Sequence, residues 1–169
     1  TPKTRVVLIN SPNNPSGAVY SEAELKALGN ALQDASTRFG KRIYLVSDEP
    51  YRLITYGAAV PSVFAAYPHS IVVNSYSKEL SLAGERIGYL AVHPRADDAG
   101  QILAAAAAIN SMLVVNAPSL FQQAAVRAEG AGVDVSLYRR RRDLICDILK
   151  SAGYEFTPPE GAFYLFPKS

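Results

Sequence analysis

The amino-acid sequence predicts an α/β fold built on a mostly parallel sheet, followed by the start of a smaller α+β domain. Over the first two-thirds of the chain, short apolar runs alternate with longer helical patterns, which is typical of parallel sheets. From about Ala99 onward the pattern becomes helical and then ends in short aromatic runs. We expect the domain boundary at this change, inside a long helix, with residues 1–136 in the first domain and 137–169 in the second.

The first elements are a buried strand and an amphipathic helix. Residues 5–10 form a short apolar run that ends in turn residues, as strands buried on both faces do. Ser21 and Glu24 match a capping box, in which each side chain binds the backbone amide of the other residue. The helix that they open carries leucines on one face and is expected to end near Gly40. Further strands are expected at residues 42–46, 70–74 and 87–92.

The rest of the chain is predicted to contain helices and a hairpin-like pair. Short runs at 154–156 and 163–166 flank a Pro-Pro break and predict two paired strands. Gly153 stands where a C-terminal helix cap would stand. The expected helices before it span residues 101–112, 119–129 and 134–152.

Composition and charge argue against several classes of protein. With 169 residues, of which 49% are hydrophobic and 19% charged, the chain has ordinary globular composition. A net charge of +2 with scattered basic residues argues against nucleic-acid and anionic-membrane partners. No apolar stretch approaches the ~20 residues needed to span a bilayer, so we expect no membrane span and a cytoplasmic protein.

Cysteine and histidine usage gives no sign of a metal site. The single cysteine, Cys146, lies in an apolar run and is expected to be a buried, unreactive thiol. His69 and His93 lie in turns beside prolines and have no companions at metal-ligand spacing. We therefore expect no metal, and a surface position for both histidines.

Four polar clusters follow predicted strands or stand in the loops beside them. In open α/β sheets, ligands bind at the carboxyl ends of the strands, so these clusters share a candidate site. Each also has a plain structural explanation: a tight turn, a helix N-cap at Asp48, a surface lysine at Lys78, or an ordinary ion-pair partner at Arg86. The clusters span residues 10–17, 47–51, 74–78 and 84–89.

Taken together, the clusters contain the parts that a Schiff-base lysine needs. Such a lysine requires an electron sink beside it and groups that hold that sink. An aspartate that faces a pyridine nitrogen keeps the nitrogen protonated, because an opposite charge favours the cation. Serine hydroxyls and an arginine suit a phosphate, and an Asn amide with a Tyr hydroxyl can both reach a phenolate oxygen.

In this order, four motifs resemble those of the class I/II aminotransferases of pyridoxal-phosphate (PLP) fold type I. The motifs are Ser-Pro-Asn-Asn-Pro-Ser-Gly, Ser-Asp-Glu-Pro-Tyr, Ser-Tyr-Ser-Lys and Gly-Glu-Arg-Ile-Gly-Tyr. The closing stretch 161–167 is similar to a segment of that family's small domain. The resemblance implies part of a three-layer α/β/α large domain that binds PLP, followed by the start of the small domain.

The resemblance also implies catalytic and ring-binding roles. Lys78 would form the internal aldimine and move a proton between the substrate Cα and the cofactor C4′. Asp48 would pair with the pyridinium nitrogen of PLP. Asn14 and Tyr51 would donate hydrogen bonds to the phenolate oxygen of the ring and so lower the aldimine pKa.

Three further residues would bind the cofactor phosphate by the same resemblance: Ser75, Ser77 and Arg86. All seven positions match the family in residue type. The departures are mild and touch no catalytic role, for example Ser16 where the family often has threonine.

The function implied is transfer of an amino group between an amino acid and a 2-keto acid, in a homodimer. Family members are much longer, so we expect this chain to be a fragment with little activity alone. The missing parts would include an N-terminal half and the arginine that grips the substrate carboxylate. Two alternatives stay open: a PLP-dependent carbon–sulfur β-lyase, and a non-catalytic effector domain of a transcription regulator.

Overall fold

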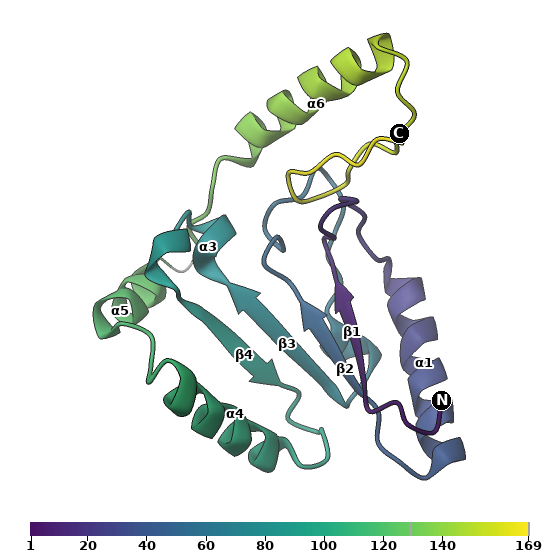
Figure 1. Cartoon of the computed structure of the whole chain (residues 1–169), viewed down its shortest axis with the longest axis vertical. Helices are drawn as coiled ribbons and strands as arrows, with labels where there is room; N and C mark the ends of the chain where they lie inside the picture. The colour runs from purple at the N-terminus through teal and green to yellow at the C-terminus, as the bar shows by residue number, and fades with distance from the viewer. Residues whose placement is uncertain (129, 169) are drawn as a thin grey trace.

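The computed structural model describes residues 1–128 and 130–168, and its centre is a four-stranded sheet in the order β1-β2-β3-β4 (Figure 1). The strands β1, β2 and β3 are parallel, and β4 runs antiparallel to β3. The prediction of a mostly parallel sheet is therefore confirmed. The strands are β1 (Val6–Asn10), β2 (Tyr44–Asp48), β3 (Ser70–Ser75) and β4 (Gly88–Val92).

The register of the sheet brings four strand ends to one edge. Asn10 pairs with Asp48 at the carboxyl ends of β1 and β2. Ser75, at the end of β3, pairs with Gly88, at the start of β4. The segments that follow β1, β2 and β3, and the one that precedes β4, therefore meet at the same edge.

Helix α1 (Glu22–Phe39) closes one face of the sheet over β1 and β2. Ser21 and Glu24 form the predicted capping box, and Gly40 ends the helix in the left-handed conformation. The short helix α2 (Val63–Ala66) packs against α1 so closely that a Cβ on Gly29 would lie 2.4 Å from the Ala66 carbonyl oxygen. The shared core consists of Ile9, Leu25, Leu32, Ile43, Leu45, Val63 and Tyr67.

The opposite face of β1 carries exposed apolar side chains. Val7 and Ile9 point toward α1, whereas Val6 is 53% exposed and Leu8 67% exposed. At the far edge of the sheet, α4 (Ala99–Leu113) runs alongside β4 (Figure 1). Among the described residues, the expected helical layers are thus α1 and α2 over β1 and β2, and α4 beside β4.

The remaining helices follow the sequence prediction with small shifts in their bounds. Helix α5 covers Ser119–Arg127; the predicted end of this helix, residue 129, lies outside the described residues. Helix α6 covers Val135–Ser151, and its N-cap Asp134 accepts hydrogen bonds from two backbone amides. Three short elements were not predicted: the helix α2, the helix α3 (Tyr76–Glu79) and the 3-10 turn η1 (Ala83–Glu85).

The predicted hairpin-like pair is wrong. Within residues 154–168 the described chain forms no strand, and one backbone hydrogen bond joins Lys168 to Glu155. Gly161 instead forms an isolated antiparallel bridge with Thr55, in the loop that follows β2. Of the aromatic residues that suggested a strand, Phe163 and Tyr164 pack against Tyr51, whereas Tyr154 and Phe166 are exposed. The contact with Tyr51 is long-range, and local pattern does not reveal it.

The predicted surface position of the two histidines is also wrong, since each is 6% exposed. The ring of His69 packs against Tyr67, and its Nδ1 accepts a hydrogen bond from the Asp97 amide. The ring of His93 packs against Phe64. Each imidazole packs its ring against an aromatic side chain and accepts a hydrogen bond from a backbone amide through Nδ1.

Other expectations concern cysteine, metals and membranes. Cys146 is 5% exposed, which confirms the prediction of a buried thiol. In the described ranges, no three His, Cys, Asp or Glu side chains gather as they would to hold a metal ion. Within the same ranges, every helix is too short or too polar to cross a bilayer.

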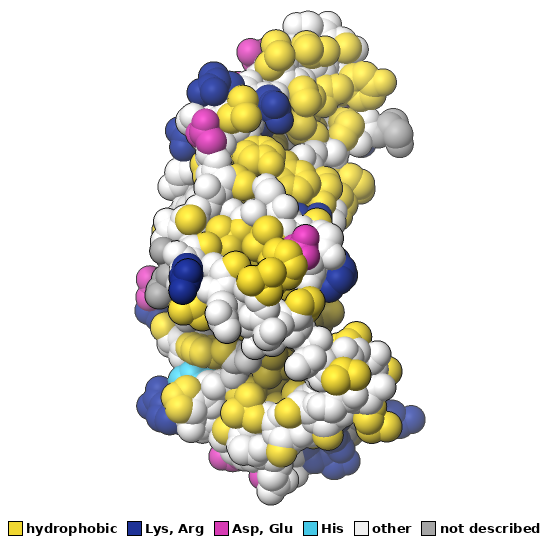
Figure 2. Space-filling view, turned by 90° about the vertical axis from the view of Figure 1, so that its left-hand side faces the viewer, with side chains coloured by type: hydrophobic (Ala, Val, Ile, Leu, Met, Phe, Trp, Pro, Cys, Tyr) yellow, Lys and Arg dark blue, Asp and Glu magenta, His cyan; other side chains and the backbone are white. Residues whose placement is uncertain are grey.

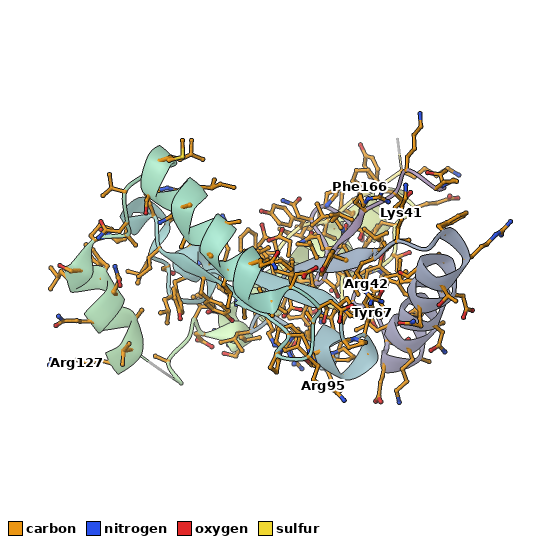
Figure 3. All side chains as sticks on the ribbon, turned by 90° about the horizontal axis from the view of Figure 1, so that it is seen from below. Lys41, Arg42, Tyr67, Arg95, Arg127 and Phe166 are labelled. Carbon is orange, nitrogen blue, oxygen red and sulfur yellow. The ribbon has the colours of Figure 1, made fainter. Side chains whose placement is uncertain are left out.

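In Figure 3, Tyr67 lies between the sheet and α1, whereas Arg127 lies at the far end of the molecule.

Candidate active site

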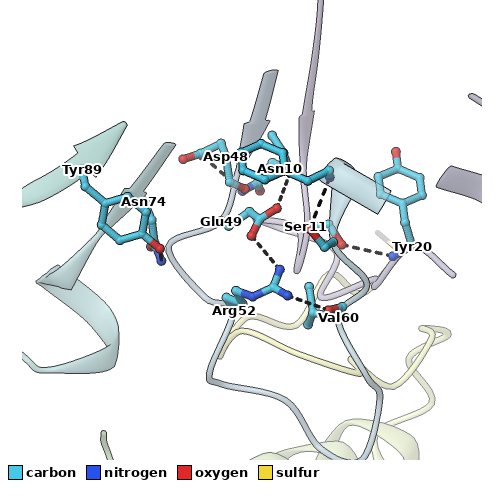
Figure 4. A network of polar contacts seen from close by, with 12 residues as sticks. Asn10, Ser11, Tyr20, Asp48, Glu49, Arg52, Val60, Asn74 and Tyr89 are labelled. Carbon is cyan, nitrogen blue, oxygen red and sulfur yellow. Dashed lines mark hydrogen bonds and ion pairs between the residues drawn. The ribbon is translucent and has the colours of Figure 1, made fainter. Parts of the chain in front are cut away.

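Asp48 stands at the edge where the parallel strands end. It is the last residue of β2, not part of the following loop as the sequence suggested. The Asn10 side-chain amide donates to its carbonyl oxygen at 2.9 Å and to Oδ2 at 3.2 Å (Figure 4). Loss of solvent raises the pKa of Asp48, and the neighbouring charge of Glu49 raises it further. A cation placed opposite this carboxylate would favour its ionised form.

The next residue, Glu49, is buried and belongs to a separate network. Ser47 Oγ donates to Glu49 Oε1 at 2.8 Å, and Arg52 Nη1 donates to Oε2 at 2.7 Å. Arg52 also donates to the Val60 carbonyl oxygen at 2.9 Å, which ties the loop after β2 to itself (Figure 4). Sequence reasoning missed this pair, although an acid and an arginine three positions apart were a usable signal.

Asn14 and Tyr51 come together from the loops that follow β1 and β2. The Asn14 backbone N–H donates to Asn10 Oδ1 at 2.7 Å, which fixes the loop against the end of β1. The Tyr51 side chain is only 4% exposed, and its hydroxyl lies 2.7 Å from the Tyr164 hydroxyl. Burial and the Tyr164 hydroxyl raise the pKa of Tyr51, while a hydrogen bond with Asn14 opposes that rise.

Lys78 lies in α3, immediately after β3, and is partly buried. Its Nζ is 5.8 Å from the centroid of the Phe163 ring, a cation–π arrangement. The Phe163 ring packs edge-on against the Tyr51 ring, with centroids 5.4 Å apart. Lys78 and Tyr51, predicted from separate motifs, therefore share one aromatic neighbour.

Ser75 and Ser77 form a hydroxyl pair at the start of α3. Ser75 Oγ donates to Ser77 Oγ at 2.8 Å and accepts from the Ser77 amide at 3.2 Å. Arg86 stands two residues before Gly88, which pairs with Ser75, and so it belongs to the same edge of the sheet. Its guanidinium donates to the Ala83 carbonyl oxygen at 2.9 Å within its own turn. A hydrogen bond thus links the two serine hydroxyls. Arg86 lies at the same edge of the sheet, but its hydrogen bond goes to Ala83 and not to either serine.

Residues 159–164, here called the return segment, connect the two loops that hold Asn14 and Tyr51. The amides of Glu160 and Gly161 both donate to the Gly17 carbonyl oxygen at 2.9 Å. The Ala162 amide donates to the Ile54 carbonyl oxygen at 2.9 Å. This contribution was missed, because the sequence assigned the closing aromatic residues to a strand.

Comparison with known proteins identifies the relatives of this chain. The family model described as aminotransferase class I and II matches residues 1–168. The aspartate aminotransferase of Geobacillus stearothermophilus is 34% identical over 180 residues, covering 100% of this chain and 43% of the relative. A protein of Bacillus subtilis named as a probable N-acetyl-LL-diaminopimelate aminotransferase is 37% identical over 174 residues, covering 99% of this chain and 41% of the relative.

The solved structures agree with the sequence relatives. An amino transferase from Eubacterium rectale matches with a TM-score of 0.96 and 46% identity, over 100% of this chain and 43% of that one. The aspartate aminotransferase of Thermotoga maritima matches with a TM-score of 0.83 and 32% identity, over the same shares of the two chains. The chain thus spans less than half the length of these relatives, and it belongs to the class I and II aminotransferase family.

Proposed function

We propose that this chain supplies the lysine-bearing part of the PLP site of a transaminase. The observation that carries the proposal is the meeting of Asp48, the Asn14–Tyr51 pair and Lys78 at one edge of the sheet. These groups lie at the end of a strand or shortly after it, on three different strands, and family members use PLP. The aminotransferase names of the relatives favour amino transfer over the β-lyase and effector-domain alternatives.

The donor set fits the cofactor chemically. Asp48 is a carboxylate in a partly desolvated position, which suits a pyridinium nitrogen because pairing with a cation offsets the cost of its charge. Asn14 and Tyr51 are neutral donors held side by side, which suits a phenolate oxygen. The paired hydroxyls of Ser75 and Ser77 suit phosphate oxygens.

Arg86 completes the phosphate set in this proposal. Its guanidinium is exposed and donates to the Ala83 carbonyl oxygen, so it would exchange that bond for phosphate oxygens. A charge-assisted fork to phosphate is stronger than a single bond to a neutral carbonyl, and the exchange is therefore favourable.

Lys78 is the proposed catalytic residue. Bound PLP supplies an electron sink that stabilises negative charge at the substrate Cα. Lys78 holds the cofactor in the resting enzyme and, as a neutral amine, takes the proton from the Cα of the amino acid. Its position in a short helix directly after β3 keeps Nζ at the sheet edge, beside the Phe163 ring.

The whole protein is proposed to move an amino group between an amino acid and a 2-keto acid as a homodimer. We also propose that the small domain begins near residue 137, within the first turn of α6. The substrate pair is left as this general class, because the matched relatives are named for different amino acids.

The test is chemical trapping of the lysine in the full-length protein. We expect PLP followed by borohydride to leave a single phosphopyridoxyl group on Lys78, located by peptide mass spectrometry. The label should be lost in Asp48→Ala and Arg86→Ala, because each removes a charge that holds the cofactor. An unlabelled Lys78 in the full-length protein would contradict the proposal.

A further inference from the structure

We infer that Tyr164 is a positioning residue, which donates a hydrogen bond to Tyr51 and so makes Tyr51 a stronger donor to the ring oxygen of the cofactor. This inference rests on the proposed function and adds a residue that sequence reasoning did not single out. It depends on three observations: the hydroxyl pair itself, the packing around it, and the way the return segment is anchored.

The hydroxyl pair allows only one direction of donation once the cofactor is bound. The oxygens of Tyr51 and Tyr164 lie 2.7 Å apart, and by geometry either can be the donor. Each hydroxyl has a single proton. If Tyr51 gives its proton to the ring oxygen, the bond between the tyrosines must be donated by Tyr164. Consecutive hydrogen bonds polarise one another, so this donation strengthens the bond from Tyr51.

Aromatic rings pack around the tyrosine pair. Tyr51 is 4% exposed, and its ring meets the Tyr164 ring edge-on with centroids 5.5 Å apart. The Phe163 ring packs on both, at centroid distances of 5.4 Å to Tyr51 and 4.8 Å to Tyr164. Phe163 is itself 37% exposed and Tyr164 is half-buried, so the rings shield mainly the Tyr51 side of the pair. A hydrogen bond in such a partly desolvated position is stronger than one in water.

The return segment holds Tyr164 at a fixed distance from both ring-binding loops. A Cβ on Gly17 would lie 2.2 Å from Pro159 Cβ, and one on Gly161 would lie 2.7 Å from Pro12 Cβ. The segment therefore touches the Asn14 loop with no room for a side chain at either glycine. Its backbone bonds to Gly17 and Ile54 then fix its position relative to both loops.

Few charged or titratable groups face the Tyr51 hydroxyl. Tyr164 comes from the return segment and Asp48 from β2. The charge of Asp48 raises the pKa of Tyr51, and Tyr164 raises it when its hydroxyl accepts the bond from Tyr51, whereas donation by Tyr164 acts the other way. The uncharged side chain of Asn14 lowers that pKa. From α3, Lys78 lies against Phe163. Among these groups, Tyr164 alone can donate a neutral hydroxyl bond to the Tyr51 oxygen.

The experiment is a pH titration of the visible absorption of bound PLP in the full-length holoenzyme. A hydrogen bond donated by Tyr51 would stabilise negative charge on the ring oxygen, and so would lower the pH at which the absorption of bound PLP changes. Tyr164→Phe should therefore raise the midpoint pH of this absorption change by about 0.3–0.5 unit. A shift of that size corresponds to part of the free energy of one neutral hydrogen bond. Tyr51→Phe should raise it more, and Tyr164→Phe should add nothing in that background.

The matched control is Tyr56→Phe, in the loop after β2. The Tyr56 hydroxyl donates to the Ala162 carbonyl oxygen, so this variant removes one tyrosine hydroxyl bond to the return segment, while the backbone bonds to Gly17 and Ile54 still hold the segment and the tyrosine pair is untouched. We expect its midpoint to equal that of the parent enzyme. Equal midpoints for Tyr164→Phe and the parent, or equal shifts in Tyr164→Phe and Tyr56→Phe, would overturn the inference. Absence of PLP on Lys78 in the parent would instead overturn the proposed function.

Discussion

Helix α1 covers a face of the sheet over β1 and β2, whereas α4 runs alongside β4 at its edge, and the two helices differ in how many of their apolar residues are buried. Helix α1 is amphipathic, and four of its residues, including Leu25 and Leu32, are buried against the sheet and α2. Helix α4 is Ala-rich and more apolar, yet none of its residues is buried. Its last turn carries Met112 at 85% exposed and Leu113 at 77% exposed.

The comparison shows that apolar composition and burial are separate properties. A helix that is apolar around its whole circumference is usually surrounded by protein. Figure 2 shows apolar side chains gathered over the flank formed by the later helices. The exposed apolar residues of α4, α5 and α6 include Leu103, Ile109, Leu120, Val126, Leu144 and Ile148. The stability of the described chain therefore depends chiefly on the α1 side of the sheet.

The largest expected effect is on that side. Leu32→Ala should lower the free energy of unfolding by about 2–5 kcal/mol, because it removes buried contacts and leaves a cavity. Leu113→Ala, on the exposed end of α4, should change it by less than about 0.5 kcal/mol. Denaturant unfolding measures both. Similar losses for the two variants would show that α4 has a partner in solution and that the contrast between the helices is false.

A smaller effect is expected where the return segment crosses the Asn14 loop. Gly17 has a φ of 71° and Gly40 a φ of 59°, so alanine is strained at both positions. Only at Gly17 would the new Cβ collide with a neighbour, Pro159, whereas nothing lies within 4 Å at Gly40. Gly17→Ala should therefore cost about 1–3 kcal/mol more than Gly40→Ala in thermal unfolding.

The comparison of the two glycine variants separates the effect of the Gly17–Pro159 contact from the backbone strain that alanine suffers at a positive φ. If the two glycine variants unfold at the same temperature, strain alone explains both losses. The return segment would then not press on the Asn14 loop as described. A larger loss at Gly17 would place the segment among the structural supports of the site, beside the core under α1.

The smallest expected effect concerns Asp48 in the cofactor-free protein. Burial and Glu49 raise the pKa of Asp48, so the folded state holds this proton more firmly than the unfolded state does. Stability should consequently fall as the pH rises from the ordinary aspartate pKa through the raised one, and it should stay lower above that range. Asp48→Asn removes this cost and should raise Tm at pH 7 by about 1–2 °C, while it weakens PLP binding.

The control for this variant is Asp34→Asn, which removes the same charge from the exposed surface of α1. Calorimetry from pH 3 to pH 8 would record the pH at which the curves of Asp48→Asn and the parent separate. A lower Tm for Asp48→Asn across that range would show that the bonds from Asn10 outweigh the cost of desolvation.

Several parts of this molecule could be read from short-range pattern. The capping box of α1, the N-cap at Asp134 and the strands near Val6, Ser70 and Gly88 follow from spacing over a few residues. The roles predicted for the seven site residues came from motifs of similar length and stay predictions, as does the domain boundary at residue 137. The end of β2 was misjudged because Ser47 and Asp48 are polar, yet strand pairing extends through both.

The sequence by itself determined the local structure near most strand ends, because capping, alternation and turn chemistry act over a few positions. The tertiary structure alone decided that Tyr51 meets Tyr164 across 113 positions, that His69 and His93 are buried, and that the closing aromatic residues form no hairpin. Those outcomes depend on which surfaces pack together, and packing joins residues whose separation carries no periodic signal.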